Sequence, residues 1–473
     1  MNLLRITDNF LKSKEYFKHI PKLVDQIKDK TLDCLEKEGI FVFPTLADAE
    51  DLTKEQKILE SVNSDYRTQN VMGFLGYGDG DNAERLVISS RFTKSDDKDG
   101  SKDYFLHYLL NKVFDFPNIF ELHSGANSDL KFYALLEFIF PYYLKQALRK
   151  GLFKTYIRKA YNDSNVKGTI DFARHIKLNT PFIGKIAYSQ REFTSDNLLM
   201  ELVRHTVEFI KGKPYGRTIL NKAKDEVRMV VESTPLYELC DRQKIIHLNK
   251  HKVIRHAFYR EYKELQKLCI LILTHQKMQV SADINRVCGV LFDGAWLWEE
   301  YINTLIEDKF FHPRNKGKSN NNGGQRLFKD DGGKIGLIYP DFIGKVAENR
   351  VIADAKYKPV GNIANKDYFQ VLAYMFRFDA KTGFYFYPEA DKNVKPLNLS
   401  LLEGCTLENN VSENRDPKIS VTKLGLQIPQ CCGSYEDFVK EIESSENNFK
   451  SIIVKSWEQE MGYQNDEIDI SAI

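Results

Sequence analysis

The chain has 473 residues, which is too long for one ordinary hydrophobic core and predicts about two to four domains. Hydrophobic residues make up 42% of the chain and aromatic residues 12%, so the composition excludes an intrinsically disordered protein. The formal charge is only +2, which excludes a uniformly basic surface and leaves any contact with nucleic acid to a local patch.

Cysteine usage and apolar segments indicate where the protein works. The 7 cysteines are odd in number and contain no C-x-x-C pair, which favours reduced thiols over a disulfide framework or a zinc site. The first ten residues lack the apolar core of a signal peptide. The most apolar run, Tyr133–Leu144, contains Glu137 and Pro141 and is too short to span a bilayer. We expect a cytoplasmic protein with no membrane contact.

The first region, residues 1–127, is predicted to be α+β. Short β-branched and aromatic runs predict strands, and apolar residues between the first two runs form an approximate helical stripe. The strands are Leu3–Ile6, Ile40–Phe43 and Leu86–Ser90, and the stripe consists of Leu23, Ile27, Leu32 and Leu35. The glycine-rich turn Leu75–Asp81 lacks the spacing of a phosphate-binding loop, so nucleotide binding has little support here.

The middle region, residues 128–281, is predicted to be mostly helical. Leu130–Lys150 forms a helix that we expect Pro141 to bend or interrupt, and an irregular segment follows over Gly151–Arg191. Ser195-Asp196-Asn197 has the composition of an N-cap for the next helix, and another helix lies within His256–Gln276. Three histidines lie in a lysine-rich context, which favours a solvated basic face over a metal site: His247, His251 and His256.

The third region, residues 282–473, begins with a predicted helix from Asp293 to about Asp308. Phe311–Gly333 is rich in asparagine, glycine and lysine and predicts a loop. Its basic residues either contact DNA phosphates or belong to a plain flexible loop: Arg314, Lys316, Lys318, Arg326 and Lys329. An aromatic strand over Thr382–Tyr387 and an amphipathic helix within Ser434–Gly462 complete the region.

A predicted β-hairpin within this region carries candidate catalytic residues. Leu337–Ile343 and Arg350–Lys358 are apolar runs joined by a polar turn, which places Asp341 about opposite Asp354. Asp354 and Lys356 are two residues apart and therefore project from the same strand face. Two crowded carboxylates require a cation, and hard oxygen ligands suit Mg²⁺. A lysine beside such a metal can orient or deprotonate the water that attacks a phosphodiester.

The residues Pro340-Asp341 and Asp354-Ala355-Lys356 resemble the signature of the PD-(D/E)xK nuclease superfamily, which has an α/β, restriction-endonuclease-like fold. Gln370 and Tyr374, spaced i,i+4 on a helix predicted from about Asn365, resemble the Q-x-x-x-Y helix of its RecB-type branch. The alternative for the short motif alone is a solvated acidic turn and a strand lysine.

The resemblance implies a role for each of these residues. Asp341, Asp354 and the Ala355 carbonyl would bind one or two Mg²⁺ ions, and Lys356 would position or activate the attacking water. Gln370 and Tyr374 would support the site from the helix. Glu299 would supply a further acidic group near the metal, although an ordinary surface carboxylate is an equal alternative for this residue.

Three blocks of the chain also resemble the McrC family. Gly151-Leu152, Tyr156 and Lys167-Gly168-Thr169-Ile170-Asp171 are similar to its middle signature, with Lys167 where the family usually has arginine. Glu192–Leu202 is similar to the next block, and Leu297–Tyr301 resembles the helix before the nuclease hairpin. The resemblance covers about residues 130–374, whereas the N-terminal region matches only in general character.

The McrC resemblance implies the Mg²⁺-dependent endonuclease subunit of a modification-dependent restriction system that cuts double-stranded DNA. Its partner would be an McrB-like AAA+ GTPase ring, whose GTP hydrolysis it would stimulate, with the first region as the natural candidate for ring contact. The absence of a phosphate-binding loop motif from this sequence agrees with that division of labour. Two alternatives remain: a stand-alone RecB-like DNA-repair nuclease, and a non-catalytic adaptor that activates the ring.

Overall fold

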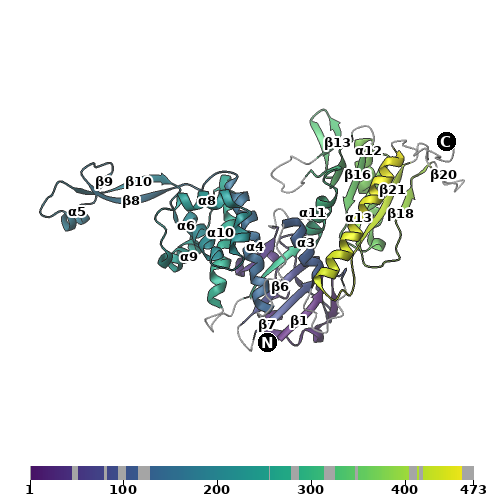
Figure 1. Cartoon of the computed structure of the whole chain (residues 1–473), viewed down its shortest axis with the longest axis horizontal. Helices are drawn as coiled ribbons and strands as arrows, with labels where there is room; N and C mark the ends of the chain where they lie inside the picture. Colours follow the sequence, from purple (N-terminus) through teal and green to yellow (C-terminus); the bar gives the residue numbers. More distant parts are fainter. Residues whose placement is uncertain are drawn as a thin grey trace, which may run out of the picture. The chain divides into compact units, whose positions relative to one another are not determined.

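The computed structural model describes residues 2–44, 52–78, 83–93, 103–114, 128–254, 256–278, 287–313, 325–346, 350–403, 413–414 and 419–460. It is a mixed α/β structure (Figure 1) that divides into two compact units. Unit 1 comprises Met1–Ser124 with Asn285–Ile473, and unit 2 comprises Gly125–Ile284. The predicted first and third regions thus share a unit, and the division into three regions stays a prediction. Among the described helices, none combines the length and apolar character needed to cross a membrane.

The first sheet of unit 1 combines strands from the first 90 residues with one strand that follows unit 2 in the sequence. Its strand order is β1 (Asn2–Thr7), β7 (Glu84–Ser89), β6 (Val71–Tyr77), β11 (Val287–Asp293) and β3 (Ile40–Phe43). β1 is parallel to β7 and β11 is parallel to β3, whereas β6 is antiparallel to both neighbours. The three predicted strands of the first region are confirmed as β1, β3 and β7. Because β11 is inserted between β6 and β3, the C-terminal segment completes the N-terminal sheet.

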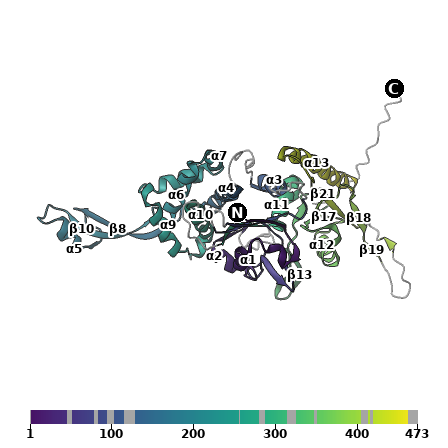
Figure 2. The ribbon, with the colours of Figure 1, turned by 90° about the horizontal axis from the view of Figure 1, so that it is seen from below.

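Helices cover both faces of this sheet. α1 (Pro21–Ile27) and α2 (Leu32–Glu38) pack their apolar side chains on one face, and α3 (Tyr104–Phe114) lies on the other (Figure 2). The predicted helical stripe is confirmed, because its four apolar residues are buried in these two helices. The helices are separate because Asp29 adopts a left-handed conformation with φ of 56° between them. Thr31 then caps α2 by accepting a hydrogen bond from the Cys34 amide.

A small antiparallel sheet stands beside this core. It has the order β2 (Leu11–Ser13), β5 (Asp65–Thr68) and β4 (Leu59–Val62), and the 3₁₀ helix η1 (Lys14–Phe17) follows β2. Phe17 is buried against Tyr66 with ring centroids 5.2 Å apart, which joins this sheet to the larger core.

The second large sheet of unit 1 carries the predicted hairpin. Its order is β12 (Phe310–Phe311), β15 (Phe342–Gly344), β16 (Val351–Ala355), β17 (Thr382–Glu389), β21 (Ser420–Gln427) and β18 (Leu397–Ser400). β16, β17 and β21 are parallel to one another, whereas the outer strands are antiparallel to their neighbours. Two further pairs are formed by β13 (Gln325–Asp330) with β14 (Gly333–Ile338), and by β19 (Leu402–Glu403) with β20 (Glu413–Asn414).

The central strand β17 is buried on both faces, as expected for a strand between helical layers. Tyr385 and Tyr387 join a core cluster with α12 (Asn365–Phe378) on one face. On the other face Phe386 lies against Phe449 of α13 (Tyr435–Glu460), with ring centroids 5.0 Å apart. α11 (Gly294–Ile306) reaches the same strand, because the Trp298 indole donates a hydrogen bond to the Phe386 carbonyl. Figure 2 shows α12 and α13 on opposite sides of the sheet.

The pairing register of the predicted hairpin is confirmed, but the predicted length of its first strand is not. The single strand predicted over Leu337–Ile343 is wrong, because β14 ends at Ile338 and β15 begins at Phe342. Pro340 lies in the break, and since proline has no amide hydrogen it cannot donate to a strand ladder. The turn predicted around Ala347–Glu348 lies outside the described residues.

Unit 2 combines a helical cluster with a long β-arm. The helices are α4 (Ser128–Leu148), α6 (Leu198–Lys211), α7 (Gly216–Asn221), α8 (Lys224–Ser233), α9 (Arg242–His251) and α10 (Arg260–Met278), with short 3₁₀ turns η4 (Leu239–Asp241) and η5 (Ala257–Tyr259). The predicted cap is confirmed, because the Asn197 side chain accepts hydrogen bonds from the Leu199 and Met200 amides. α4 continues through Pro141, so the predicted interruption does not occur.

The arm comprises residues 155–194 and replaces the irregular segment predicted there, which is a correction. β8 (Thr155–Asp163) and β10 (Ile186–Thr194) pair antiparallel along their whole length, with β9 (Thr169–Ile170) beside β10 and α5 (Phe172–Leu178) at the far end (Figure 1). β8 alternates between half-buried and exposed side chains, so it has no apolar run to identify it as a strand. A side chain at Gly168 would place Cβ 2.2 Å from the Ser189 carbonyl oxygen, which explains the glycine at this close approach.

Candidate active site

The paired strands β15 and β16 bring the two predicted aspartates together. Phe342 pairs with Ala353 and Ile343 pairs with Ile352, so the same register carried one residue further sets Asp341 opposite Asp354. Ile352 and Ala353 are buried, which fixes the strand in the sheet and leaves only one orientation for its polar residues. The predicted juxtaposition of the two aspartates is confirmed.

Asp354 and Lys356 form a close ion pair at the end of β16. The carboxylate of Asp354 is 0% exposed, and its Oδ2 atom lies 2.6 Å from the Lys356 ammonium nitrogen. Burial alone would lower the pKa of Lys356, but the nearby charges of Asp354 and Asp341 outweigh it and raise that pKa. Lys356 is therefore held in its protonated, cationic form at the end of β16, on the same strand face as Asp354.

Asp341 approaches the same point from the opposite strand. Its Oδ2 atom accepts a hydrogen bond of 2.8 Å from the Ala355 amide, the residue between Asp354 and Lys356. This bond fixes the Asp341 carboxylate beside the ion pair. The break at Pro340 is what allows Asp341 to turn toward the end of β16 rather than continue along a longer strand.

The helix α12 supplies the predicted supporting pair. Gln370 accepts a hydrogen bond of 3.2 Å from the Lys356 ammonium through Oε1. Its amide nitrogen donates to the Tyr374 hydroxyl at 2.7 Å. Burial raises the pKa of Tyr374, so its hydroxyl stays protonated and can serve as a hydrogen-bonding group. The helix starts at Asn365 as predicted, and the two residues lie one turn apart on the face toward the sheet.

Glu299 lies inside the protein rather than on its surface. The side chain on α11 is 1% exposed, so the alternative of an ordinary surface carboxylate is wrong. Its Oε1 atom lies 3.4 Å from Nε2 of His312, whose Nδ1 donates a 2.8 Å hydrogen bond to the Asp341 carbonyl oxygen. Glu299 is thus connected to the Asp341 backbone through one imidazole.

His312 was not anticipated from the sequence. It follows the two-residue strand β12, and its ring lies 5.2 Å from that of Phe342, the residue after Asp341. A lone histidine before a proline carries no recognisable spacing, so only the pairing of β12 with β15 could identify it.

A second unanticipated group joins the site to the N-terminal sheet. Tyr357, directly after Lys356, is buried, and its hydroxyl lies 2.8 Å from the Ser90 hydroxyl. The Arg91 guanidinium donates to the Tyr357 carbonyl and pairs with the buried Asp8 carboxylate at 3.1 Å. Gly294 makes room for this ring, because a Cβ there would lie 2.8 Å from Tyr357. Residues from both ends of the chain therefore fix the backbone that follows Lys356.

The donor set fits a hard divalent cation. The Oδ1 atom of Asp354 is buried and has no hydrogen-bond partner within the described part of the chain, which is costly unless a cation or water satisfies it. The Asp341 carboxylate, hydrogen-bonded to the Ala355 amide, offers further oxygen atoms. Mg²⁺ characteristically uses one or two carboxylates and completes its coordination with water and substrate phosphate. Across the described residues, no group of three or more His, Cys, Asp or Glu side chains is arranged to hold a metal.

The other candidates of the sequence belong to other elements of the fold. His247 and His251 lie one turn apart on α9 in unit 2, and His256 caps η5 by accepting a hydrogen bond from the Phe258 amide. The loop predicted over Phe311–Gly333 is wrong in its last part, because Gln325–Asp330 forms strand β13, which carries Arg326 and Lys329. Arg314, Lys316 and Lys318 lie outside the described residues.

Comparison with known proteins gives a family and two similar structures. The family model described as McrBC 5-methylcytosine restriction system component matches residues 66–388. A half-complex from the tetradecameric assembly of Thermococcus gammatolerans McrB AAA+ hexamers with bound McrC has 14% identity and a TM-score of 0.42, and the match covers 93% of this chain and 99% of that chain. The cryo-EM structure of the Thermococcus gammatolerans McrBC complex has 14% identity and a TM-score of 0.28, covering 64% of this chain and 87% of that chain. No curated protein matches.

Fold and site together define a mixed α/β protein with two carboxylates and a lysine gathered at the end of a buried strand. The family match spans well over half of the chain and includes all of these residues. The chain belongs to the family of McrBC 5-methylcytosine restriction system components.

Proposed function

We propose that this chain is the McrC-type nuclease subunit of an McrBC-like restriction system and hydrolyses double-stranded DNA with Mg²⁺. The observation that carries the proposal is the arrangement around β16. A fully buried Asp354 lies 2.6 Å from Lys356, with Asp341 hydrogen-bonded to the residue between them. We propose that these residues form the site of a PD-(D/E)xK nuclease, with Asp341, Asp354 and the Ala355 carbonyl as metal ligands.

Each side chain has a distinct task in this proposal. Bound Mg²⁺ would lower the pKa of a water molecule and neutralise charge on the phosphate under attack. Lys356 presents an ammonium group that orients the water and stabilises negative charge on the phosphate oxygens. Gln370 holds that ammonium in place, and Tyr374 in turn holds Gln370. Glu299, connected to the Asp341 backbone through His312, keeps the first aspartate in position.

The decisive experiment compares wild type with Asp354→Ala on modified and unmodified plasmid DNA in the presence of Mg²⁺. Each protein is assayed alone and with the AAA+ protein encoded beside it, with and without GTP. Cutting by wild type only, and only with partner and GTP, is the expected result. Cutting by wild type alone would favour a stand-alone nuclease, and faster GTP hydrolysis without cutting would favour a non-catalytic adaptor. Cutting that survives Asp354→Ala would refute the assigned site.

We further propose that the arm of unit 2 contacts the GTPase ring. Its far end exposes an unusual number of large apolar side chains: Phe172, Ile176, Leu178, Phe182 and Ile183. Exposed apolar patches of this kind mark surfaces that another protein covers. The McrC in the Thermococcus gammatolerans assembly is bound to McrB AAA+ hexamers, and we propose an equivalent partner here. Ring contact by the N-terminal region stays a prediction.

The arm is tested separately from the nuclease site. The double variant Phe172→Ser/Phe182→Ser should lose stimulation of GTP hydrolysis and co-elution with the ring, because these side chains lie outside the folded core of the unit. The matched control is Leu236→Ser/Leu239→Ser, which removes two exposed apolar side chains of the same unit outside the arm. If the arm variant stimulates GTP hydrolysis as strongly as wild type does, the proposed arm contact is wrong and the N-terminal region is again the candidate for ring contact.

A further inference from the structure

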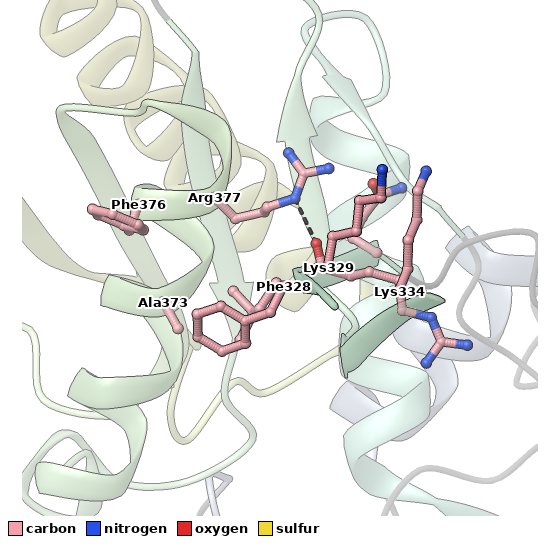
Figure 3. A pocket seen from close by; sticks show the side chains of 9 residues that line it. Phe328, Lys329, Lys334, Ala373, Phe376 and Arg377 are labelled. Carbon is pink, nitrogen blue, oxygen red and sulfur yellow. Dashed lines mark hydrogen bonds between the residues drawn. The ribbon is translucent and has the colours of Figure 1, made fainter. Parts of the chain in front are cut away.

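A second surface of unit 1 has the character of a binding groove. The hairpin of β13 and β14 and one side of α12 border a hollow of about 630 Å³ (Figure 3). Its lining comes from these elements alone: Gln325, Arg326, Leu327, Phe328, Lys329, Lys334, Ala373, Phe376 and Arg377. We call this surface the basic groove.

The groove concentrates positive charge. Four of its lining residues are cationic and none is a carboxylate: Arg326, Lys329, Lys334 and Arg377. The Arg377 side chain is anchored by a 2.7 Å hydrogen bond from Nε to the Arg326 carbonyl, which Figure 3 shows as a bridge between helix and hairpin. A local patch of this kind is what a chain of formal charge +2 needs in order to bind an anionic polymer.

Two of the lysines are placed where stability alone would disfavour them. Lys329 and Lys334 are directly paired across the hairpin, and both are exposed. Like charges directly opposite each other on neighbouring strands destabilise the pairing. A bound anion between or above the two ammonium groups would offset this repulsion.

Two of the lining residues carry exposed aromatic rings. Phe328 on the hairpin is 65% exposed and Phe376 on α12 is 88% exposed. Exposed rings among lysine and arginine side chains are characteristic of surfaces that bind nucleic acid, where the rings pack on bases and sugars while the cations contact phosphates. A protein partner would be a poorer occupant, because the desolvated cations would need carboxylates in matching positions.

The groove continues from the candidate active site along one helix. Gln370, which hydrogen-bonds Lys356, precedes Ala373 by three residues and Arg377 by seven, so all three lie on one side of α12. At a helical rise of about 1.5 Å per residue, the groove extends roughly 5–10 Å beyond Gln370 along the helix axis. At about 3.4 Å per nucleotide, this distance corresponds to roughly one to three nucleotides of one strand.

We propose that the basic groove binds the DNA strand next to the phosphate that is cut. Arg326, Lys329, Lys334 and Arg377 contact its phosphates, and Phe328 and Phe376 pack against its sugars or bases. The inference rests on the proposed nuclease function and adds to it the residues that hold the substrate beside the site.

The test measures DNA binding without cutting. The full chain carrying Asp354→Ala is titrated into a fluorescent 30-bp duplex without divalent metal, alone and with the partner ring, at several salt concentrations. In this background the charge-reversal pair Lys329→Glu/Lys334→Glu is compared with Lys395→Glu/Lys440→Glu. The control lysines are also exposed and produce the same change in net charge, but they lie outside the groove.

The groove variant should bind DNA at least about tenfold more weakly than the control variant, and the slope of log affinity against log salt should fall by about two. Phe328→Ser should weaken binding with no change in that slope. Equal affinities for groove and control variants, or no DNA binding by the parent protein in either condition, would overturn the proposal. Loss of ring assembly by Phe328→Ser with unchanged DNA affinity would also overturn it, in favour of a protein partner.

Failure of the nuclease assignment is distinguishable from failure of the groove. Suppose that wild type does not cut under any condition, but the groove variant binds DNA more weakly than the control variant does. The groove proposal is then supported and the catalytic proposal fails. If wild type cuts and the groove variant binds DNA as the control does, the catalytic proposal holds and the groove fails.

Discussion

Replacing Lys356 by methionine tests the charge arrangement at the centre of the site. Methionine keeps an unbranched side chain of similar length but removes the ammonium group that lies 2.6 Å from Asp354. Asp354 is then left as a fully buried carboxylate beside Asp341, with no cation from the protein at that contact. We expect loss of both DNA cleavage and stability.

The loss of stability can be estimated from the geometry. Two unit charges 2.6 Å apart attract by about 6 kcal/mol at an effective dielectric constant of about 20, and the cost of removing both from water offsets part of this. Breaking a buried pair by removing one partner typically costs about 3–5 kcal/mol. The Lys356 side chain is 17% exposed, so we take the lower end, about 3 kcal/mol. For a unit of this size the melting temperature should fall by roughly 5 °C.

The assay combines thermal unfolding with plasmid cleavage, in EDTA and in excess Mg²⁺. Mg²⁺ should restore part of the lost stability, because a divalent cation can take the place of the missing ammonium between the carboxylates. It should not restore cutting. The control is Lys358→Met, two residues along, where the lysine pairs with Asp367 at 2.7 Å and is more exposed than Lys356. This control should keep cutting and lose less stability.

Unchanged stability in Lys356→Met, together with normal cutting, would refute the reasoning about the ion pair. A fall in stability that is the same with and without Mg²⁺ would leave the ion pair intact as an explanation but would contradict the assignment of the carboxylates as metal ligands.

Three further changes test other parts of the structure. Asn197→Ala removes the cap of α6 and should lower the stability of unit 2 by about 1–2 kcal/mol in urea unfolding. Asn197→Asp keeps the accepting oxygen but sets a carboxylate oxygen against the backbone carbonyls to which the Asn197 amide nitrogen donates, so it should not restore the lost stability. Arg91→Leu leaves the buried Asp8 without its ion pair and frees the Tyr357 carbonyl, so stability at pH 8 should fall by about 3 kcal/mol and cutting should slow. The fall should be smaller at pH 6, because burial raises the pKa of Asp8 to about 7 and protonation removes the unpaired charge, and unchanged values of stability and cutting would contradict the proposed link. Burial lowers the pKa of His205 to about 4 from 6.5, so the unfolded state binds more protons between these values and stability is lost as pH falls through that range. His205→Phe should reduce this loss by up to about 3 kcal/mol, measured as the difference in unfolding free energy between pH 7 and pH 4, and an unchanged pH dependence would argue against the buried neutral imidazole.

The local sequence pattern was sufficient to predict the hairpin of β15 and β16, because the pairing of its residues follows from their spacing along the chain. Asp354 and Lys356 share a strand face by the two-residue period of a strand, and Asp341 lies opposite Asp354 by counting back from the turn. Gln370 and Tyr374 were equally predictable, since the i,i+4 spacing places them on one helix face. The extent of the first strand was not predictable from its apolar residues alone, because Pro340 divides it.

The arm was missed for a physical reason. Its strands pair with each other, and β8 has no buried side chain, so its sequence lacks the apolar run that a buried sheet imposes. The residues around the candidate site were missed for a different physical reason. His312, Arg91 and Tyr357 meet only because β12 pairs with β15 and β11 is inserted into the N-terminal sheet.

The sequence by itself therefore determined the chemical groups of the candidate site and their positions on one hairpin and one helix. These relations depend on spacings of two to four residues, or on one short turn, which the local backbone geometry fixes. Only the tertiary structure decided that Glu299 is buried beside His312, that Arg91 and Asp8 fix the backbone at Tyr357, and that Arg377 of α12 bonds the Arg326 carbonyl of the hairpin in the basic groove. Such contacts join residues far apart in the chain, and they are set by the packing of whole sheets and helices rather than by any local preference.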